Sequence, residues 1–405
     1  MSQVNYLLVD INSFFASCEQ QDNPHLRKRP VAIVPMLAEN TSVLAASIEA
    51  KRKGIKTGTK VYEARKMCPG IVFIEGHHKK YTEYHHKIVA AVDEVCPVYK
   101  VLSIDEMACE LIGRETIEEN AIKIALRIKK NIEEKVGVCL TSSVGLSTNI
   151  LLAKMASDLI KPDGLVSVPK EKIGITFDHL PVEIISGVGR NMKKKLNAKG
   201  FYTVGQLRAL SPVQMRSLWG SIVGLRLAEE LAGQNIKRVE QQSKSMSHEH
   251  VLPPNLRHAK GAKDILLKLS AKAAYRLREK NQKCRHLYIG VRDQLTHEKY
   301  EKTISFQETS DTFFILSQVE KLYAAMRVTK PIKVSIAVSG LTNSQEEQLS
   351  LFADQKTQKI SHAMDIINKK FGANTLVTAG YLDVIDQAKV RVAFNHIPTL
   401  EDEFD

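Results

Sequence analysis

The order of strand-like and helix-like segments is the feature that most constrains the fold of this chain. From residue 5 to residue 160, short apolar runs alternate with segments of helical spacing in the order βαβαββαβα, which predicts an α+β core with an antiparallel element. Between Pro169 and Gly233 the segments are short, basic and purely helical. Residues 246–342 then follow the order β-α-β-β-α-β, which is the split βαβ motif. The chain of 405 residues is therefore expected to fold as several domains.

Local signals place the individual elements. The apolar run at residues 5–11 is expected to form a buried strand, and Asn12 is a good N-cap for a helix over residues 13–21. In the first part, further strands are expected at 31–34, 98–104, 107–112 and 138–146, and further helices at 45–53, 81–95, 117–135 and 149–160. In the last part, strands are expected at 244–252, 284–293, 301–307 and 332–341, and helices at 262–280, 314–327 and 360–371. Residues 234–245 are polar and uncapped, which is typical of a linker.

The charge balance narrows the range of partners. The formal net charge of +13 favours a polyanionic partner, because each Lys or Arg that neutralises a phosphate releases counterions. A membrane partner is disfavoured, since no stretch approaches the ~18 apolar residues that span a bilayer. Surplus lysine that only confers solubility stays open as an alternative. The six cysteines form no CxxC pair and the N-terminus has no secretion signal, so we expect a reduced, cytoplasmic protein.

Three acidic residues stand beside predicted strands. Asp10 ends the first strand, and Asp105 and Glu106 are adjacent between two strands. Transfer of a phosphoryl or nucleotidyl group on two metal ions needs carboxylates that hold the cations ~4 Å apart. A strand-end cap and a solvated turn would leave the same pattern. Spacing alone favours this second interpretation, because nothing in the sequence shows that position 10 meets position 105.

Three segments of the sequence favour the two-metal site over the cap and the turn. They are VDINSFFASCE at residues 9–19, SIDEMACEL at 103–111 and VGLSTNILLAKMASDLIKPDG at 144–164. In this order they closely resemble the catalytic-palm motifs of the Y-family DNA polymerases, the ImpB/MucB/SamB superfamily, and the first phrase is most similar to the UmuC branch. The resemblance extends from residue 5 to about residue 350 and implies an α+β multidomain right-hand polymerase fold. It implies a palm at 1–20 and 77–168, fingers at 21–76, a helix-hairpin-helix thumb at 169–233, a linker at 234–245, a split βαβ little finger at 246–342, and a clamp-binding peptide and tail at 343–405.

The same resemblance implies the chemistry of the site. In the family, the residues that match Asp10, Asp105 and Glu106 bind two Mg²⁺ ions, with the backbone carbonyl that matches Ile11 as a further ligand. Mg²⁺ prefers oxygen ligands and is helped by substrate phosphates. The implied reaction is the addition of dNTPs to a primer end on primer–template DNA.

The incoming dNTP has its own implied contacts. Backbone amides near Ser13, Phe14 and Phe15 would hold the triphosphate at a helix N-terminus, and Lys161 would contact its terminal phosphates. Phe15 falls where the family places its steric gate, a ring that clashes with a ribose 2′-hydroxyl. Without the family, both phenylalanines would be interpreted as core residues and Lys161 as a solvated lysine at a helix end.

The helix predicted after residue 45 departs from the family pattern. Many members carry a Tyr and an Arg that grip the triphosphate, and the matching positions here are Ile48 and Lys51. Lys51 can still neutralise charge without bidentate geometry, whereas Ile48 cannot donate a hydrogen bond. Ser42 and Leu44 are expected to line the roof over the templating base, where Leu44 is larger than the residue usual in more permissive members. These departures leave the catalytic efficiency and the range of lesions open.

A basic segment after Pro169 suggests contacts with DNA. Residues 185–200 resemble the helix-hairpin-helix of the family thumb, in which glycines let backbone amides approach a phosphate. The expected DNA contacts are Gly187, Gly189, Arg190, Lys193, Lys194 and Lys195. A lone GxG is usually a simple turn, so the basic helix that follows it is what favours DNA binding.

A short peptide past the last predicted strand resembles the QL(S/D)LF peptide that binds the bacterial sliding clamp. Its residues are Gln348, Leu349, Ser350, Leu351 and Phe352. A Gln and two apolar anchors can dock an extended segment into a hydrophobic pocket, although a strand end that packs its Leu and Phe would have the same sequence. The likeness to the UmuC branch also raises UmuD-like and RecA-type partners of the SOS response.

Three functions are compatible with these motifs. The first is an active translesion DNA polymerase, which the three acids favour. The second is a catalytically weak, clamp-tethered DNA-binding accessory of the same fold, which Ile48 and Leu44 keep open. The third, a cyclase-type palm enzyme, would leave the helix-hairpin-helix and the clamp peptide without a use. The histidines at positions 77, 78, 85 and 86 lack a Cys or an acid to complete a zinc shell, and we expect them on a solvated helix face.

Overall fold

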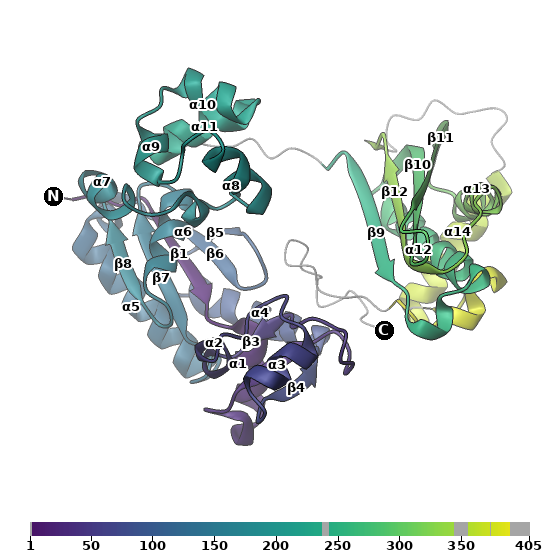
Figure 1. The fold of residues 1–405 in the computed structure, drawn as a ribbon, viewed down its shortest axis with the longest axis horizontal. Helices are drawn as coiled ribbons and strands as arrows, with labels where there is room; N and C mark the ends of the chain where they lie inside the picture. The colour runs from purple at the N-terminus through teal and green to yellow at the C-terminus, as the bar shows by residue number, and fades with distance from the viewer. Residues whose placement is uncertain (1, 237–242, 344–354, 373, 389–405) are drawn as a thin grey trace. The chain divides into compact units, whose positions relative to one another are not determined.

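The chain divides into two compact units, each with its own hydrophobic core. A computed structural model describes residues 2–236, 243–343, 355–372 and 374–388 (Figure 1). The first unit contains the described residues up to 236, and the second contains those from 243 onwards. Within these ranges, no helix is long and apolar enough to cross a bilayer.

A five-stranded sheet with the strand order β5-β6-β1-β7-β8 forms the centre of the first unit. Its strands are β1 (Tyr6–Ile11), β5 (Val98–Val101), β6 (Glu106–Glu110), β7 (Ser142–Ser147) and β8 (Leu165–Val168). The central strand β1 is buried along its whole length and pairs antiparallel with β6 on one side and with β7 on the other. Strand β8 pairs parallel with β7 and was not among the predicted elements, because Ser167 interrupts its short apolar run.

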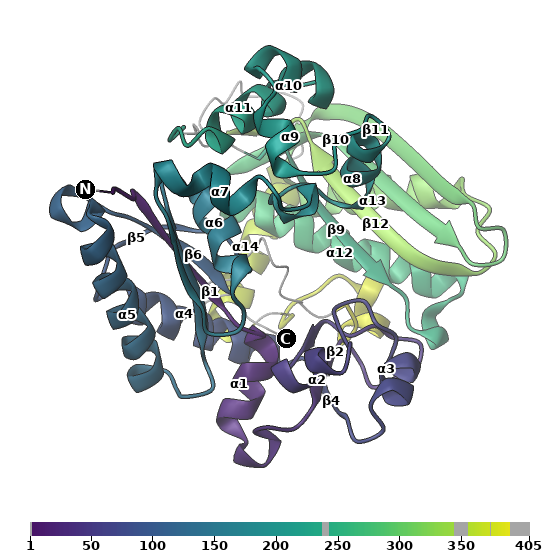
Figure 2. The ribbon, with the colours of Figure 1, turned by 60° about the vertical axis from the view of Figure 1, so that its left-hand side comes forward.

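Helices cover both faces of this sheet. They are α4 (His78–Asp93), α5 (Glu118–Lys135) and α6 (Ile150–Leu159). Helix α6 packs on the face of β1 that carries Tyr6 and Leu8, whereas α4 and α5 lie together against the other face (Figure 2). The approach of α6 is so close that a Cβ atom on Gly145 of β7 would lie 1.9 Å from the carbonyl oxygen of Ala153. Only glycine fits at this point of the sheet.

A second sheet of the first unit has three strands in the order β3-β2-β4. Its strands are β2 (Val31–Val34), β3 (Ala45–Ala46) and β4 (Val72–Glu75), and its helices are α1 (Phe14–Asp22), α2 (Ile48–Arg52) and α3 (Val61–Met67). The helix predicted from residue 45 starts only at Ile48, because Ala45 and Ala46 pair with β2. The Ser47 hydroxyl then caps α2 by accepting the amide N–H of Ala50 at 3.3 Å. Strand β4 was also not predicted, and it is as short as β8.

The predicted cap of α1 is wrong. The N-cap residue is Ser13, which has a left-handed backbone (φ 52°) and makes no capping hydrogen bond through its side chain. The side chain of Asn12 instead donates to Ser143 Oγ at 3.0 Å and accepts the backbone N–H of Asp163 at 2.8 Å. These distant partners outweigh the local preference of Asn for a helix cap.

Five short helices follow the five-stranded sheet, as the sequence predicts. They are α7 (Ile173–Phe177), α8 (Arg190–Asn197), α9 (Val204–Arg208), α10 (Pro212–Trp219) and α11 (Ile222–Leu231). Phe177, Leu196, Leu207 and Leu231 are buried in one cluster with Leu152 of α6. The sheet part and the all-helical part of the first unit therefore share a continuous core.

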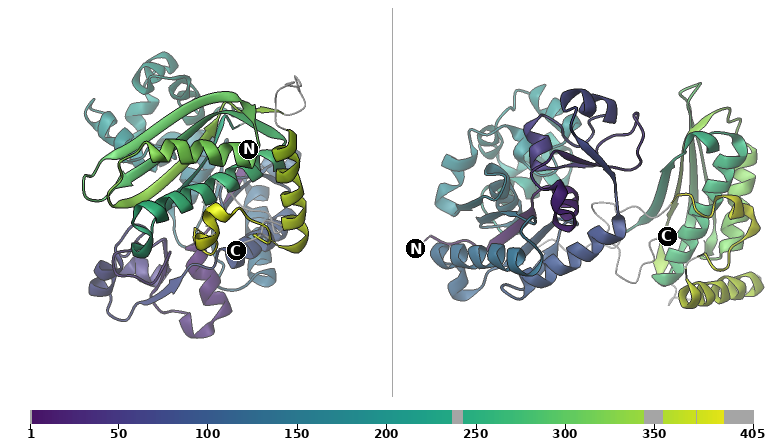
Figure 3. Two further views of the ribbon diagram at one scale, coloured as in Figure 1. Left: turned by 90° about the vertical axis from the view of Figure 1, so that its right-hand side faces the viewer. Right: turned by 90° about the horizontal axis from the view of Figure 1, so that it is seen from below.

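The second unit contains a four-stranded antiparallel sheet with the order β11-β10-β12-β9. Its strands are β9 (Ser245–Val251), β10 (Gln282–Asp293), β11 (Lys299–Thr309) and β12 (Pro331–Ser339), with the short β13 (Thr342–Asn343) beside β10. Helices α12 (Ala259–Glu279) and α13 (Thr312–Ala324) lie side by side on one face of the sheet (Figure 3). This element order confirms the predicted split βαβ motif.

The tail beyond β13 is part of the second unit. It contains α14 (Gln355–Phe371) and a 3₁₀ helix at Ala379–Val384. Tyr381 and Val384 are buried in the same core cluster as Leu267 of α12. The hydroxyl of Ser361 in α14 donates to Asp311 at 3.1 Å, so α14 is attached to the start of α13. A segment for which the sequence suggests no role thus completes a hydrophobic core.

Candidate active site

The three predicted acids meet at one end of the five-stranded sheet. Asp10 at the end of β1 is the direct partner of Glu106 at the start of β6. The next residue, Ile11, donates its backbone N–H to the carbonyl oxygen of Asp105 at 2.9 Å. Asp10 is buried and the other two acids are half-buried, so they do not form a separate cap and a solvated turn. Antiparallel pairing therefore brings together Asp10 and Glu106, which are 96 residues apart in the chain.

Two lysines that follow β7 supply the opposite charge. Lys154 Nζ lies 2.5 Å from Asp10 Oδ2 and 2.9 Å from Glu106 Oε1. Lys161 Nζ lies 2.8 Å from the same oxygen of Asp10. Asp158 joins the pair, at 3.2 Å from Lys154 and 2.7 Å from Lys161. Lys154 was not among the predicted site residues, although the spacing of residues 154, 158 and 161 is that of one helix face and was a usable signal.

Burial disfavours the charged forms of the acids in this cluster. It raises the pKa of Asp105, which the Ser103 hydroxyl opposes by donating to Oδ1 at 2.6 Å. Burial also raises the pKa of Glu106, and the charge of Lys154 opposes it. Although burial lowers the pKa of Lys154 itself, the charges of Asp10 and Glu106 outweigh burial and raise it. Partly dehydrated carboxylates of this kind need positive charge beside them.

The donor set suits a magnesium ion. Mg²⁺ takes oxygen ligands and uses one or two carboxylates together with substrate phosphates. Within the part of the chain that the structure describes, no three His, Cys, Asp or Glu side chains are arranged to hold a metal ion as they stand. Asp105 accepts the Ser103 hydroxyl, and Lys154 bridges the other two acids. The ammonium groups of Lys154 and Lys161 thus neutralise carboxylate charge that a divalent cation could also neutralise.

The residues predicted to hold the dNTP follow directly after these acids. Ser13 turns the chain with its left-handed backbone, and its hydroxyl is a buried atom without a hydrogen-bond partner among the described residues. Phe14 and Phe15 are 3% and 4% exposed. The ring of Phe15 stacks on Tyr81 of α4, with 4.3 Å between ring centroids and 14° between planes. A ring held in this way cannot easily move aside.

The second sheet adds a cation to the same region. Burial lowers the pKa of Lys51 in α2, the charge of Lys161 lowers it further, and Asp10 and Asp105 oppose the shift. These interactions place Lys51 within the electrostatic reach of the acid cluster. Ile48, Ser42 and Leu44 are half-buried on the same part of the chain.

Comparisons with known proteins agree with this geometry. The model of the impB/mucB/samB family matches residues 9–158, and that of the family's C-terminal domain matches residues 243–351. DNA polymerase IV of Moorella thermoacetica is 32% identical over 386 residues, which cover 93% of this chain and 95% of the relative. The chain belongs to the impB/mucB/samB family, the Y-family of DNA polymerases.

Further relatives and solved structures of Y-family polymerases extend the match. DNA polymerase IV of Pelotomaculum thermopropionicum is 30% identical over 92% of this chain and 94% of the relative, and DNA polymerase IV 2 of Bacillus subtilis is 29% identical over 97% and 98%. A Y-family DNA polymerase chimera of Dbh and Dpo4 superimposes with a TM-score of 0.70 at 20% identity, covering 84% of this chain and 99% of the chimera. An insertion ternary complex of Dbh DNA polymerase gives a TM-score of 0.57 at 22% identity, with the same coverage. The predicted α+β multidomain right-hand fold is thereby confirmed, while the likeness to the UmuC branch stays a prediction.

The predicted DNA contacts of this Y-family polymerase lie in α8 and in the turn that precedes it. Gly187 has a left-handed backbone (φ 95°), and a Cβ atom on Gly187 or Gly189 would meet nothing within 4 Å. Arg190, Lys194 and Lys195 are exposed, whereas Lys193 forms an ion pair with Glu183. The turn therefore presents its backbone outward beside a basic helix, which is the arrangement a phosphate contact requires.

The clamp-binding prediction falls outside the described residues of this Y-family polymerase. Gln348, Leu349, Ser350, Leu351 and Phe352 all lie between residues 344 and 354. The described neighbours on either side, β13 and α14, both belong to the second unit.

The prediction that the histidines lie on a solvated helix face is wrong for His85 of α4. His85 is 3% exposed and not on a solvated face, and its Nδ1 lies 2.7 Å from the carbonyl oxygen of Ile104. Burial lowers the pKa of His85. His77 pairs with Glu19 at 3.0 Å. His85 thus supports the residue that precedes Asp105, a role that helical spacing alone does not reveal.

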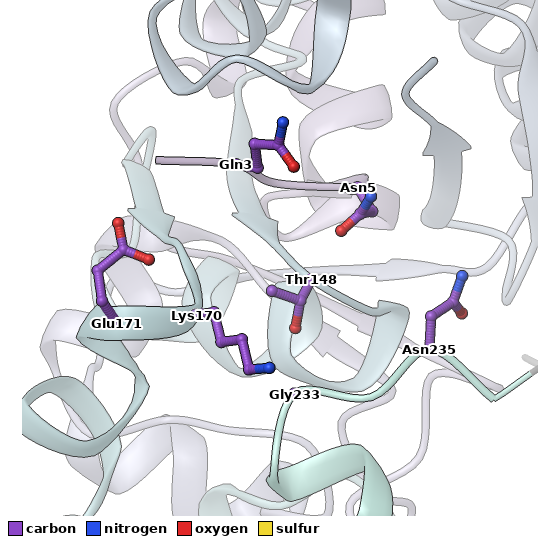
Figure 4. A pocket seen from close by; sticks show the side chains of 7 residues that line it. All are labelled: Gln3, Asn5, Thr148, Lys170, Glu171, Gly233 and Asn235. Carbon is purple, nitrogen blue, oxygen red and sulfur yellow. The ribbon is translucent and has the colours of Figure 1, made fainter. Parts of the chain in front are cut away.

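A pocket of about 360 Å³ lies away from the acid cluster (Figure 4). It is lined by Gln3, Asn5, Thr148, Lys170, Glu171, Gly233 and Asn235. Asn5 precedes β1, whereas Asp10 is near its other end, so the pocket and the acid cluster lie at opposite ends of this strand. Glu171 is already engaged by the Ser2 hydroxyl, and Asn235 donates to the Tyr6 hydroxyl at 3.0 Å.

Proposed function

We propose that this protein is a translesion DNA polymerase that adds dNTPs to a primer 3′ end by nucleotidyl transfer on two metal ions. The observation that carries the proposal is the pairing of Asp10 with Glu106 beside Asp105 at one end of the sheet. We assign the palm to residues 1–20 and 77–168, the fingers to 21–76, the thumb to 169–233, the linker to 234–245 and the little finger to 246–342. The tail, which packs into the second unit, is an addition to the little finger.

The carboxylates of Asp10, Asp105 and Glu106, with the backbone carbonyl of Ile11, would hold two Mg²⁺ ions. When bound, Mg²⁺ makes the primer 3′-hydroxyl a better nucleophile and neutralises the leaving pyrophosphate. The chain's own residues prepare the site: β1 and β6 fix two acids on paired strands, and Lys154 limits their mutual repulsion. Because the strands are buried, the carboxylates do not have to be assembled at the moment of reaction.

The triphosphate would bind beside the acids. The backbone amides of Ser13, Phe14 and Phe15 lead into α1 and would donate to phosphate oxygens, and Lys161 and Lys51 would neutralise its charge. Ile48 adds no donor, so binding depends on charge more than on bidentate hydrogen bonds. The stacked ring of Phe15 would exclude a ribose 2′-hydroxyl and so select dNTPs.

Primer–template DNA would be held through its backbone. Gly187, Gly189, Arg190, Lys193, Lys194 and Lys195 are the thumb contacts in this proposal. Contacts of this kind neutralise phosphates without reading sequence, which suits an enzyme that must accept damaged templates. In this proposal the protein works in the cytoplasm and binds the sliding clamp through residues 348–352. UmuD-like or RecA-type proteins of the SOS response are its further partners.

Primer extension by the purified protein tests this function. With Mg²⁺, dNTPs and a damaged template, we expect the native protein to incorporate nucleotides and Asp105→Ala to lose incorporation. Glu134→Ala, which removes an exposed acid of α5, is the matched control and should keep it. Equal activity of the native protein and Asp105→Ala would overturn the assignment. The second candidate is a DNA-binding accessory function, which Ile48 favours because it cannot donate a hydrogen bond to the triphosphate. An accessory protein would bind DNA strongly, and the native protein, Asp105→Ala and Glu134→Ala would all show little incorporation.

Clamp binding has a separate test. Deletion of residues 348–352 should abolish stimulation by the sliding clamp while basal synthesis continues, because tethering raises the local concentration without changing the site. If the deleted protein is still stimulated, the clamp assignment is wrong and the polymerase assignment stands.

A further inference from the structure

Asn12 stands between the acids and the nucleotide residues, and neither group includes it. It is 5% exposed and follows Ile11 directly. Its backbone N–H donates to the carbonyl oxygen of Thr141 at 2.9 Å, and its carbonyl oxygen accepts the Ser17 hydroxyl at 2.7 Å. The backbone of Asn12 is therefore attached to the residue before β7 and to α1. Its side chain is not needed for these two contacts.

That side chain reaches the loop that carries Lys161. Its Oδ1 accepts the backbone N–H of Asp163 at 2.8 Å, and its Nδ2 donates to Ser143 Oγ at 3.0 Å. Ser143 donates in turn to the carbonyl oxygen of Ile160 at 3.2 Å. Asn12 and Ser143 together hold the residues on both sides of Lys161.

The loop would not keep this shape without such contacts. Asp163 has a left-handed backbone (φ 61°), which a non-glycine residue keeps only where its surroundings hold it. Lys129 of α5 supports it from another side, since its Nζ lies 2.8 Å from the Asp163 carbonyl and 2.7 Å from its carboxylate. The loop is also tight, because a Cβ atom on Gly164 would lie 2.1 Å from the Ile160 carbonyl oxygen.

The placement of Lys161 depends on this loop. A lysine is a point charge on a flexible stem, so its reach is set by where its backbone is anchored. Its Nζ lies 2.8 Å from Asp10 and 2.7 Å from Asp158, at the edge of the acid cluster. We propose that Asn12 is a positioning residue that fixes Lys161 for the terminal phosphates of the dNTP. This inference rests on the proposed function and names the residue that couples the metal-binding strand to one of its nucleotide contacts.

Steady-state incorporation of single dNTPs by the full chain tests the inference. In Asn12→Ala the Asp163 N–H loses its acceptor, and we expect the KM for dNTP to rise about tenfold while kcat stays within about threefold and the affinity for primer–template is unchanged. Lys161→Ala should show the same change. The double variant should be no worse than Lys161→Ala alone, because a positioning residue has nothing left to position.

Thr141→Val is the matched control. It removes only the 3.3 Å hydrogen bond from the Thr141 hydroxyl to Asn12 Oδ1 and leaves the bond to Asp163, so the KM should stay within about twofold of the native value. If thermal unfolding shows that Asn12→Ala does not fold, Ser143→Ala tests the same link and should also raise the KM. A loss confined to kcat, or losses that multiply in the double variant, would overturn the inference. A native protein without any incorporation would instead refute the proposed function and not the link itself.

Discussion

Arg278 at the end of α12 binds Asp365 of α14 through two hydrogen bonds, from Nε at 2.6 Å and from Nη2 at 2.8 Å. The Arg278 side chain is only 6% exposed, and its remaining arm donates to the Ser310 carbonyl oxygen at 2.6 Å. A bidentate pair of this kind joins the tail to α12, the first helix of the split βαβ unit. The tail is thus held by a buried charge as well as by apolar packing.

Asp365→Ala should destabilise the second unit by about 3 kcal/mol, because it leaves a buried guanidinium group without its partner. The chain has one tryptophan, Trp219 in the first unit, so fluorescence reports that unit while circular dichroism reports both. In urea we expect the dichroism transition to move to lower concentration and the fluorescence transition to stay. Asp383→Ala, which removes an exposed partner of Lys260, is the control and should move neither. Unchanged dichroism in Asp365→Ala would show that the Arg278–Asp365 pair contributes nothing to stability.

Lys154→Met should increase the affinity of the free protein for Mg²⁺ several-fold. The Lys154 ammonium bridges Asp10 and Glu106, so it competes with any cation for the same oxygens. Isothermal titration with Mg²⁺ in the absence of DNA measures the effect. Lys130→Met removes an exposed lysine of α5 and should leave the affinity unchanged. A weaker affinity in Lys154→Met would show that the lysine organises the carboxylates and does not compete for them.

Asp293 should make the second unit sensitive to acid. Its carboxylate accepts the backbone N–H groups of Leu295 at 2.8 Å, Thr296 at 3.2 Å, Thr329 at 2.8 Å and Lys330 at 2.8 Å. Burial raises the pKa of Asp293, but these four donors outweigh burial and hold the pKa below its usual range. Because the folded-state pKa lies below the unfolded-state value of ~3.9, the ionised group stabilises the fold above that pH. This contribution is lost as the pH falls through the folded-state pKa.

Asp293→Asn is the corresponding variant. At neutral pH it should lower the free energy of unfolding by about 2 kcal/mol, because one NH₂ group then faces backbone donors. Its stability should also fall less steeply than that of the native protein below pH ~4. Urea unfolding followed by circular dichroism across this pH range measures both effects, with the exposed Glu279→Gln as control. Parallel pH profiles for native protein and variant would rule out a depressed pKa at this position.

Phe15→Leu should reduce the preference for dNTPs over rNTPs by about tenfold or more, because the smaller side chain no longer meets the 2′-hydroxyl. Single-nucleotide incorporation of dCTP and rCTP opposite template guanine gives the ratio. Phe14→Leu is the control, since Phe14 is equally buried but does not stack face to face on Tyr81. The gate assignment fails if both variants keep the native ratio.

The sequence predicted most elements of the fold because their periods are long and strong. Helices such as α5 and α12 and strands such as β1 and β10 were placed within a few residues. The failures have local causes. Strands β4 and β8 each include a polar residue among their four, unlike the wholly apolar β2 of the same length, and β3 has only two residues, so none of them stands out as an apolar run. The packing of Tyr381 could not be anticipated, since it depends on contacts with a helix more than a hundred residues earlier.

The site was predicted from motifs, and its supporting residues were not. Asp10, Asp105 and Glu106 could be named only through the family resemblance, because strand pairing is not visible in spacing. Asn12 was expected to cap a helix, since local propensity says nothing of Asp163 lying within hydrogen-bond distance. Lys154 was overlooked because a lysine in a helix is usually solvated, and only the fold shows that it faces two acids.

The burial of Tyr381 and Val384 has a consequence for biosynthesis. Domains generally fold as units while the chain leaves the ribosome, N-terminal ones first. The described core residues of the first unit all precede residue 236, whereas the core of the second unit lacks two of its buried side chains until residue 384 is made. An interrupted translation product that ended at residue 351, where the family's C-terminal domain match stops, would therefore carry a first unit with its core residues complete. The attached second unit would be unfinished and sensitive to proteases.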